Sequence, residues 1–240
     1  MGALGVKFGY GMQMSEAHVL VVDDEPALCE IFVQWMKIAG CRSVRAERDG
    51  EAALAAVAEG PVDVMVTDVR MPRMDGVTLV RRLVEIGESI PTIIFVSGFG
   101  DVDHREMYGL GVEAFLSKPL RREELMDAVK RAIADRNGLW MERMEIAPRQ
   151  KLDIVVRKKS IRLGRGGFSA PCPGPMTQGI VAFQCRLDET GVLAGQGFVR
   201  WYSRTEQRVG IEFAFLEEQC RAKILEEIAG SGPTGFVPRD

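Results

Sequence analysis

Residues 62–76 have the sequence VDVMVTDVRMPRMDG, in which an apolar run ends at an aspartate and is followed by a proline and a glycine. Short apolar runs bounded by turn residues are typical of strands that are buried on both faces of a parallel sheet. Further runs of this kind lie at 18–22, 91–96 and 112–116, with a weaker one near 42–46. The chain is therefore expected to contain a parallel sheet of five strands.

Segments with helical spacing of their apolar residues alternate with these strands, at 27–39, 51–58, 77–86, 102–108 and 123–136. Repeated β/α units of this length predict a doubly wound α/β domain, which we expect over 16–135. Ligands of such folds bind at the carboxyl ends of the strands. Chemistry is therefore expected at the residues that follow each strand.

The two halves of the 240-residue chain differ in charge. Residues 1–140 contain 16 Lys and Arg against 22 Asp and Glu, whereas residues 141–240 contain 15 against 12. An acidic and a basic half predict two domains with different roles. The Gly-rich leader 1–15 and the Gly/Pro-rich tail 230–240 are expected to be disordered.

The five cysteines are scattered and form no Cys-x-x-Cys pair, which favours reduced thiols over a zinc or redox site. No apolar run approaches the roughly 18–20 residues that span a bilayer, and the N-terminus lacks the pattern of a signal peptide. A cytoplasmic protein is therefore expected.

Charged and hydroxyl side chains follow the predicted strands. Asp23 and Asp24 end the first strand, Asp68 ends the third, Ser97 ends the fourth, and Lys118 follows the fifth. By the strand-end rule, these side chains converge on one crevice. Carboxylates at close quarters repel one another unless a cation joins them, and hard oxygen ligands favour Mg²⁺. A divalent metal site is therefore expected.

The same crevice suits phosphoryl transfer. With metal bound, Asp68 can act as a carboxylate nucleophile and become an aspartyl phosphate. Lys118 would offset charge on the transferred group, and the Ser97 hydroxyl would donate a hydrogen bond to one of its oxygens. Little else is required, because phosphoryl transfer depends mostly on positioning and electrostatics.

Four blocks of sequence carry a family resemblance: VVDDE at 21–25, DVRMPRMDG at 68–76, SG at 97–98 and FLSKP at 115–119. In order and separation they resemble the signature of response regulator receiver domains. The resemblance covers about 16–135. It implies a sensor histidine kinase as partner and phosphodonor, and it implies no enzyme activity beyond the autophosphatase-type chemistry of the phosphoacceptor itself.

The resemblance also implies a ligand set for Mg²⁺. Asp24, Asp68 and the main-chain oxygen of Arg70 would bind the ion, and Asp23 would act directly or through water.

A switch and a backbone feature are implied in the same way. Ser97 and Phe115 match the family's hydroxyl and aromatic pair, in which the hydroxyl moves to the phosphoryl group and the ring turns inward. Simple core packing is the alternative role of Phe115. Lys118 and Pro119 would be joined by a cis peptide bond.

Residues 136–149 still contain helix formers and predict a helical linker. The fifth helix either runs on as a linker or dimerising stalk, or gives way to an ordinary solvated connector. A homodimer through the receiver or the linker helix is compatible with this pattern.

From residue 150 onward the helical period gives way to alternation, as in Val181, Phe183, Cys185 and Leu187. A hairpin turn is expected at 188–191 between strands, followed by a strand at 207–215 and an amphipathic helix at 216–229. The pattern predicts a small β-barrel or sandwich over 150–229 with a C-terminal helix.

This second domain resembles the PilZ domain, a bacterial β-barrel that often binds cyclic di-GMP. The resemblance rests on GGF at 166–168, GFVRW at 197–201 and VGIEF at 209–213. Ligand-binding members carry an Arg-x-x-x-Arg loop and an Asp/Asn-x-Ser-x-x-Gly turn, which grip phosphates and read base edges. Both are missing here, since Arg162 and Gly164 stand where the acid and the serine should be. A degenerate PilZ-like domain that acts by protein interaction is therefore expected.

A basic patch leaves cyclic di-GMP as an alternative ligand, because such a patch attracts phosphodiesters of any sort. A solvated strand face, a protein partner or a nucleic-acid partner would explain it equally, so a DNA-binding regulator is a further alternative. The second half contains no histidine and no catalytic constellation, so no enzyme is expected there. The patch consists of Arg157, Lys158, Lys159, Arg162 and Arg165.

Overall fold

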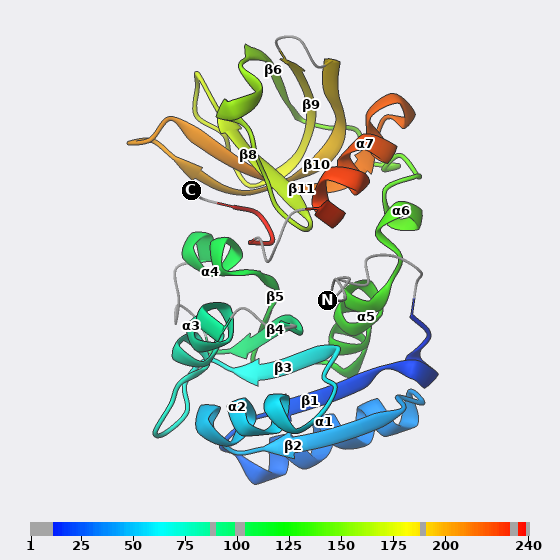
Figure 1. Cartoon of the computed structure of the whole chain (residues 1–240), viewed down its shortest axis with the longest axis vertical. Helices are drawn as coiled ribbons and strands as arrows, with labels where there is room; N and C mark the ends of the chain where they lie inside the picture. Colours follow the sequence, from blue (N-terminus) through cyan, green and yellow to red (C-terminus); the bar gives the residue numbers. More distant parts are fainter. Residues whose placement is uncertain (1–11, 87–89, 99–103, 188–190, 231–234, 239–240) are drawn as a thin grey trace, which may run out of the picture. The chain divides into compact units, whose positions relative to one another are not determined.

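The computed structural model describes residues 12–86, 90–98, 104–187, 191–230 and 235–238. These residues belong to two compact units (Figure 1). The first unit contains the described residues up to 98 together with 112–134. The second contains 104–111 together with the described chain from 135 onward.

A five-stranded parallel sheet forms the centre of the first unit. The strand order is β2-β1-β3-β4-β5. The three inner strands are almost wholly buried, which explains their near-continuous apolar sequences. The strands are β1 (His18–Val22), β2 (Ser43–Glu47), β3 (Val64–Asp68), β4 (Thr92–Ser97) and β5 (Val112–Ser117).

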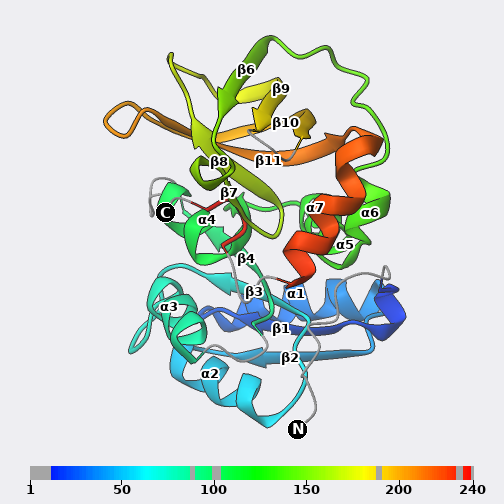
Figure 2. The ribbon, with the colours of Figure 1, turned by 45° about the horizontal axis from the view of Figure 1, so that its top comes forward.

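Helices cover both faces of this sheet (Figure 2), so the predicted doubly wound topology is confirmed. On one face α1 (Pro26–Ile38) and α5 (Arg122–Ile133) bury a core with alternate strand residues such as Ile94. The next residue, Phe95, points to the other face, where its ring lies beside the first residue of α3 (Gly76–Ile86). Helix α2 (Gly50–Glu59) contacts α3 there.

The expected disorder of the leader 1–15 is wrong for its last residues. Met12 donates its amide hydrogen to the Ile133 carbonyl at 3.0 Å, and a 3-10 turn, η1, follows at Met14–Glu16. Met12 and Met14 pack against the core between the sheet and helices α1 and α5. These two methionines supply an apolar surface within a Gly-rich segment. Residues 1–11 lie outside the described part of the chain.

The predicted helical linker over 136–149 is wrong beyond its first turn. Helix α5 ends at Ile133, and a separate four-residue helix, α6 (Arg136–Leu139), follows. Asp135 starts α6 as an N-cap, because its side chain accepts from the amides of Asn137 and Gly138 at 3.2 and 3.1 Å. A cap at this point begins a new helix instead of continuing the old one.

Residues 140–149 contain no helix. Trp140 is 2% exposed, and its carbonyl accepts the Leu216 amide hydrogen at 3.0 Å, so it belongs to the core of the second unit. Tertiary packing overrides the helix propensity of this stretch.

The second unit contains a six-stranded sheet in the order β6-β9-β10-β11-β8-β7. Strand β6 pairs with β9 in parallel, and the other neighbours are antiparallel. The predicted hairpin is confirmed by the pairing of Leu187 with Gly191, although the turn residues 188–190 lie outside the described ones. The strands are β6 (Gln150–Val156), β7 (Arg162–Leu163), β8 (Gly167–Pro171), β9 (Gly179–Leu187), β10 (Gly191–Ser203) and β11 (Arg208–Leu216).

The sheet curls into part of a barrel (Figure 1). Among the described strands, β6 and β7 form its edges and do not pair with each other, so the expected barrel is an open, mixed sheet. Val181, Phe183 and Cys185 alternate into its core, as their spacing predicted. Helix α7 (Glu218–Gly230) packs against this core through Cys220, Ile224 and Ile228.

Part of the tail is ordered, which corrects the expected disorder of 230–240. Residue 230 ends α7, and within the described segment 235–238 Phe236 is 3% exposed and Val237 is fully buried. A short apolar pair supplies this burial within a stretch whose Gly/Pro content predicted disorder. Residues 231–234 and 239–240 lie outside the described part.

The cysteines are unpaired, as expected, and four of the five are buried. Burial raises the pKa of the Cys185 thiol to about 12. Within the described ranges, every helix is too short or too polar to span a bilayer.

Candidate functional site

Three carboxylates meet at the carboxyl ends of β1 and β3. Asp23, Asp24 and Asp68 each offer an oxygen within 4.8 Å of the others. The parallel sheet brings them together, because β1 and β3 are neighbours and end at the same edge. Asp23 is buried and Asp24 is exposed, so the cluster opens to solvent on one side.

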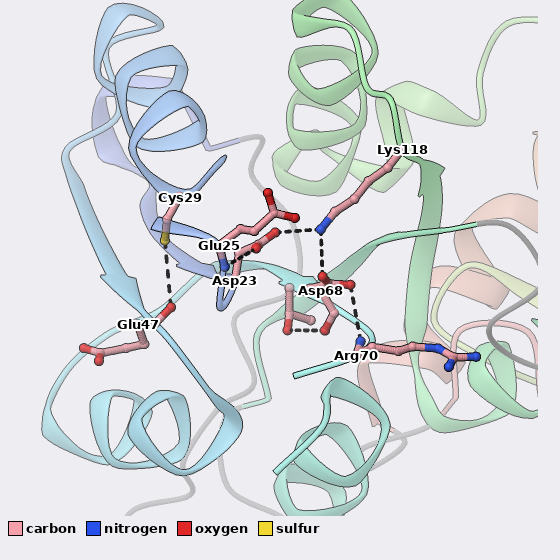
Figure 3. A network of polar contacts seen from close by, with 8 residues as sticks. Asp23, Glu25, Cys29, Glu47, Asp68, Arg70 and Lys118 are labelled. Carbon is pink, nitrogen blue, oxygen red and sulfur yellow. Dashed lines mark hydrogen bonds and ion pairs between the residues drawn. The ribbon is translucent and has the colours of Figure 1, made fainter. Parts of the chain in front are cut away.

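Lys118 reaches into this cluster from the end of β5 (Figure 3). Its ammonium nitrogen lies 2.7 Å from Asp68 Oδ2 and 3.0 Å from Asp23 Oδ2. The opposite oxygens, Oδ1, accept backbone amides: Asp23 from Glu25 at 2.9 Å and Asp68 from Arg70 at 3.3 Å. These contacts fix the orientation of both carboxylates.

The cluster is electrostatically incomplete by itself. Burial raises the pKa of Asp23 and outweighs the Glu25 amide and Lys118, which lower it. Burial would lower the pKa of Lys118, but hydrogen bonds to Asp68 and Asp23 raise it, so the ammonium stays charged. Three carboxylates against one ammonium leave two negative charges to be balanced.

The donor set fits Mg²⁺. Opposite ligands of an octahedral Mg²⁺ lie about 4.2 Å apart, close to the 4.8 Å limit that contains these oxygens. Each carboxylate oxygen has two lone pairs, so the hydrogen bonds to Lys118 and to the amides leave room for a cation. A divalent ion would also balance the two remaining charges. Asp23, Asp24 and Asp68 are therefore the residues that would hold it.

The Arg70 side chain extends away from the carboxylates (Figure 3), so its main chain is the part that faces Asp68. The Lys118–Pro119 peptide bond is cis. Its amide side is anchored, because the Lys118 N–H donates to the Ser97 carbonyl at 2.8 Å.

The predicted switch residues lie on β4 and β5, which are neighbours in the sheet. Ser97 is 9% exposed, and its hydroxyl donates to the Gly98 carbonyl at 3.1 Å. Phe115 is half-buried, with its ring centroid 5.8 Å from that of Phe95.

A second anchor of the acceptor loop was not predicted from the sequence. Asp49 is 3% exposed, caps α2 and forms an ion pair with Arg73, which has a left-handed φ of 65°. Beside it, Gly50 donates its amide hydrogen to the Met74 carbonyl at 3.0 Å. The loop between β3 and α3 is thereby tied to the start of α2. An Asp-Gly pair at a helix start was the available signal, but its partner 24 residues away was not readable.

Gly76 gives a testable prediction about the acceptor strand. A Cβ at this position would lie 2.2 Å from the Asp68 carbonyl oxygen, and the Gly76 amide donates to the Val69 carbonyl at 2.9 Å. We expect Gly76→Ala to destabilise the protein by about 1–3 kcal/mol, because the backbone at Asp68 must move. Phosphorylation by acetyl phosphate should slow by roughly tenfold or more, since small misplacements of reacting groups are costly.

Gly60→Ala is the matched control, because no atom lies within 4 Å of its added Cβ and its φ is extended. Thermal unfolding and label uptake would be measured for both variants. Equal behaviour of the two would show that the close approach at Gly76 does not constrain the acceptor.

The predicted basic patch of the second unit is divided by the structure. Lys158 pairs with Glu227 of α7 at 3.0 Å, and Arg165 donates to the Gly111 carbonyl at 2.9 Å. Exposed members of the patch are Arg157, Lys159 and Arg162.

Residues 19–130 match the model of the response regulator receiver domain family. The chain is 33% identical over 141 residues to the response regulator protein TmoT of Ectopseudomonas mendocina, covering 58% of each protein. It is 34% identical over 116 residues to the response regulator protein TodT of Pseudomonas putida, covering 48% of this chain and 50% of TodT. The chain thus spans about half the length of these relatives.

Among solved structures, a CheY-like response regulator receiver domain from Methylobacillus flagellatus is 25% identical, with a TM-score of 0.45. That match covers 49% of this chain and 98% of the solved chain. The family match, the parallel sheet and the carboxylate cluster with Lys118 agree, and residues 19–130 form a response regulator receiver domain.

Proposed function

We propose that this chain is a two-component response regulator in which a sensor histidine kinase phosphorylates Asp68 and the second unit acts as the output. The observation that carries the proposal is the cluster of Asp23, Asp24 and Asp68 joined by Lys118 at the strand ends. A cluster of this kind binds a divalent cation and a phosphoryl group together.

In the proposed reaction an Asp68 carboxylate oxygen forms a bond to phosphorus, and the bond from phosphorus to the donor nitrogen of the kinase breaks. Mg²⁺, when bound, supplies compensation for charge on the transferred group. Lys118 would stabilise the same charge from the other side, since it already lies 2.7 Å from the acceptor. Ser97 and Phe115 would respond as the switch pair, the hydroxyl leaving Gly98 for a phosphoryl oxygen. We infer no further enzyme activity.

For the output, we favour interaction with a protein partner. In the sequence a PilZ-like nucleotide site would use the turn before Gly167. Here the backbone of that turn is engaged, because the amides of Arg165 and Gly166 donate to the Gly235 and Phe236 carbonyls, each at 3.0 Å. A Cβ at Gly166 would overlap the Phe236 ring at 1.8 Å. The C-terminal segment therefore occupies the place of a turn-bound ligand.

A phosphorylation-gated sensor of cyclic di-GMP is the second candidate. Arg157, Lys159 and Arg162 are exposed and would attract a phosphodiester. A DNA-binding output rests on the same charges, and its affinity would fall steeply with salt.

A calorimetric titration of cyclic di-GMP in the presence of Mg²⁺, with and without beryllofluoride as a phosphoryl mimic, separates the first two candidates. We expect no binding in either state. Micromolar or tighter binding would favour the nucleotide sensor, and a change caused by the mimic would show that the chain combines two signals. Arg162→Ala would then serve as the variant that locates the site.

A further inference from the structure

Helix α4 (His104–Leu110) belongs to the second unit. In sequence it lies between Ser97 on β4 and Phe115 on β5, the predicted switch residues of the receiver domain. A segment of the receiver sequence is thus packed within the unit that contains the output sheet, and the contacts that hold it there can be named.

The C-terminal segment Gly235–Pro238 runs beside α4, as both views of the ribbon show (Figures 1 and 2). The Tyr108 carbonyl accepts the amides of Phe236 and Val237 at 2.9 and 3.3 Å. Gly235 lies so close to α4 that an added Cβ would be 2.2 Å from the Gly109 carbonyl oxygen. The segment is therefore hydrogen-bonded to the last turn of α4.

The other side of this segment is bound to the sheet. Besides the amides of Arg165 and Gly166, which donate to the Gly235 and Phe236 carbonyls, Trp201 of β10 places its indole nitrogen 3.5 Å from the Val237 carbonyl. Residues 235–237 thus connect α4 to the β7–β8 turn and to β10. Their burial shows that this is a packed layer and not a loose end.

A polar cluster on β10 and β11 completes the grip on α4. Arg200 forms an ion pair with Glu212, which is 5% exposed, and its guanidinium lies 5.7 Å from the centre of the Tyr108 ring. The pair stays compatible with water if α4 leaves, whereas a purely apolar surface would not. The contact is therefore of a separable kind.

We propose that the segment Gly235–Pro238 is a latch that holds α4 in the second unit, and that phosphorylation of Asp68 controls the output by changing how tightly this latch holds α4. The second clause rests on the proposed function. Because coupling between two sites is reciprocal, a weakened latch must alter the affinity of the receiver domain for a phosphoryl mimic by the same factor.

Gly235→Ala tests the latch, because its Cβ would force the segment away from Gly109. Phe236→Ala is a second disrupting variant, which removes the buried ring without adding bulk. Gly174→Ala is the matched control in the same unit, since no atom lies within 4 Å of its added Cβ. Thermal unfolding would verify that all three proteins are folded.

Two measurements would be made on the full chain. Without any phosphoryl mimic, amide hydrogen exchange at 107–111 should be at least about fivefold faster in both disrupted variants than in the control. With Mg²⁺, their affinity for beryllofluoride should differ from the control by at least about fivefold, the lower end of typical allosteric coupling.

Unchanged exchange at 107–111 would overturn the latch. Faster exchange with unchanged beryllofluoride affinity would overturn its role in signalling. If the wild-type protein did not bind beryllofluoride at all, the proposed function would fail, and the exchange comparison would still decide separately whether the latch exists.

Discussion

Asp68→Asn is expected to abolish covalent labelling by acetyl phosphate, with uptake falling at least about 100-fold to the background of the assay. The carboxylate oxygen is the nucleophile, and a neutral amide is too weak a nucleophile to replace it. The fold should survive, because Asn is isosteric and its oxygen can still accept from Lys118, which lies 2.7 Å from Asp68 Oδ2. Label uptake in the presence of Mg²⁺, with thermal unfolding recorded in parallel, measures both effects.

Asp127→Asn is the matched control for this substitution. Asp127 is an exposed residue of α5 outside the carboxylate cluster, and its amide variant should take up label at the wild-type rate. Labelling of the Asp68→Asn protein at that same rate would place the phosphoacceptor elsewhere and defeat the assignment. Loss in both variants would indicate a general effect of charge.

The receiver site could be predicted because its geometry follows from the topology. In a parallel sheet the carboxyl ends of neighbouring strands meet, so the residues after β1, β3 and β5 had to converge once the strands were recognised. The strands were recognisable because burial on both faces makes them continuously apolar. Asp23, Asp68 and Lys118 therefore lie within 3.0 Å contacts although they are far apart in sequence.

Features that depend on single long-range contacts could not be predicted. The ion pair between Asp49 and Arg73 requires a left-handed backbone at Arg73, for which arginine has no preference. The parallel pairing of β6 with β9 has no signature in alternation alone, because both directions give the same period.

The ends of the chain failed for a related reason. Phe236 and Val237 stand in a Gly/Pro-rich tail, and composition predicts disorder for such a segment. Their order comes from partners that are remote in sequence, Tyr108 and Trp201. Asp135 did carry a readable local signal, a capping residue before Asn-Gly, and the linker would have been shortened had the cap been weighed above helix propensity.

Lys118→Met should change two properties of the receiver domain in opposite directions. Lys118 contacts both Asp68 and Asp23, and it therefore competes with a metal ion for the same carboxylates. Without the ammonium the pocket is more negative, so we expect Mg²⁺ to bind roughly tenfold more tightly, as a modest Coulomb term of about 1–2 kcal/mol would give. Phosphorylation at saturating Mg²⁺ should nevertheless slow by roughly 100-fold, because a charged donor to the transferred group is lost.

Calorimetric titration of Mg²⁺ and label uptake from acetyl phosphate measure these two effects separately. Lys130→Met, an exposed position on α5, is the control and should leave both unchanged. Weaker Mg²⁺ binding together with slower phosphorylation would mean that Lys118 mainly holds the carboxylates in place. Opposite signs would show that its charge acts on the transferred phosphoryl group, since a purely structural role cannot tighten the metal site while it slows the reaction.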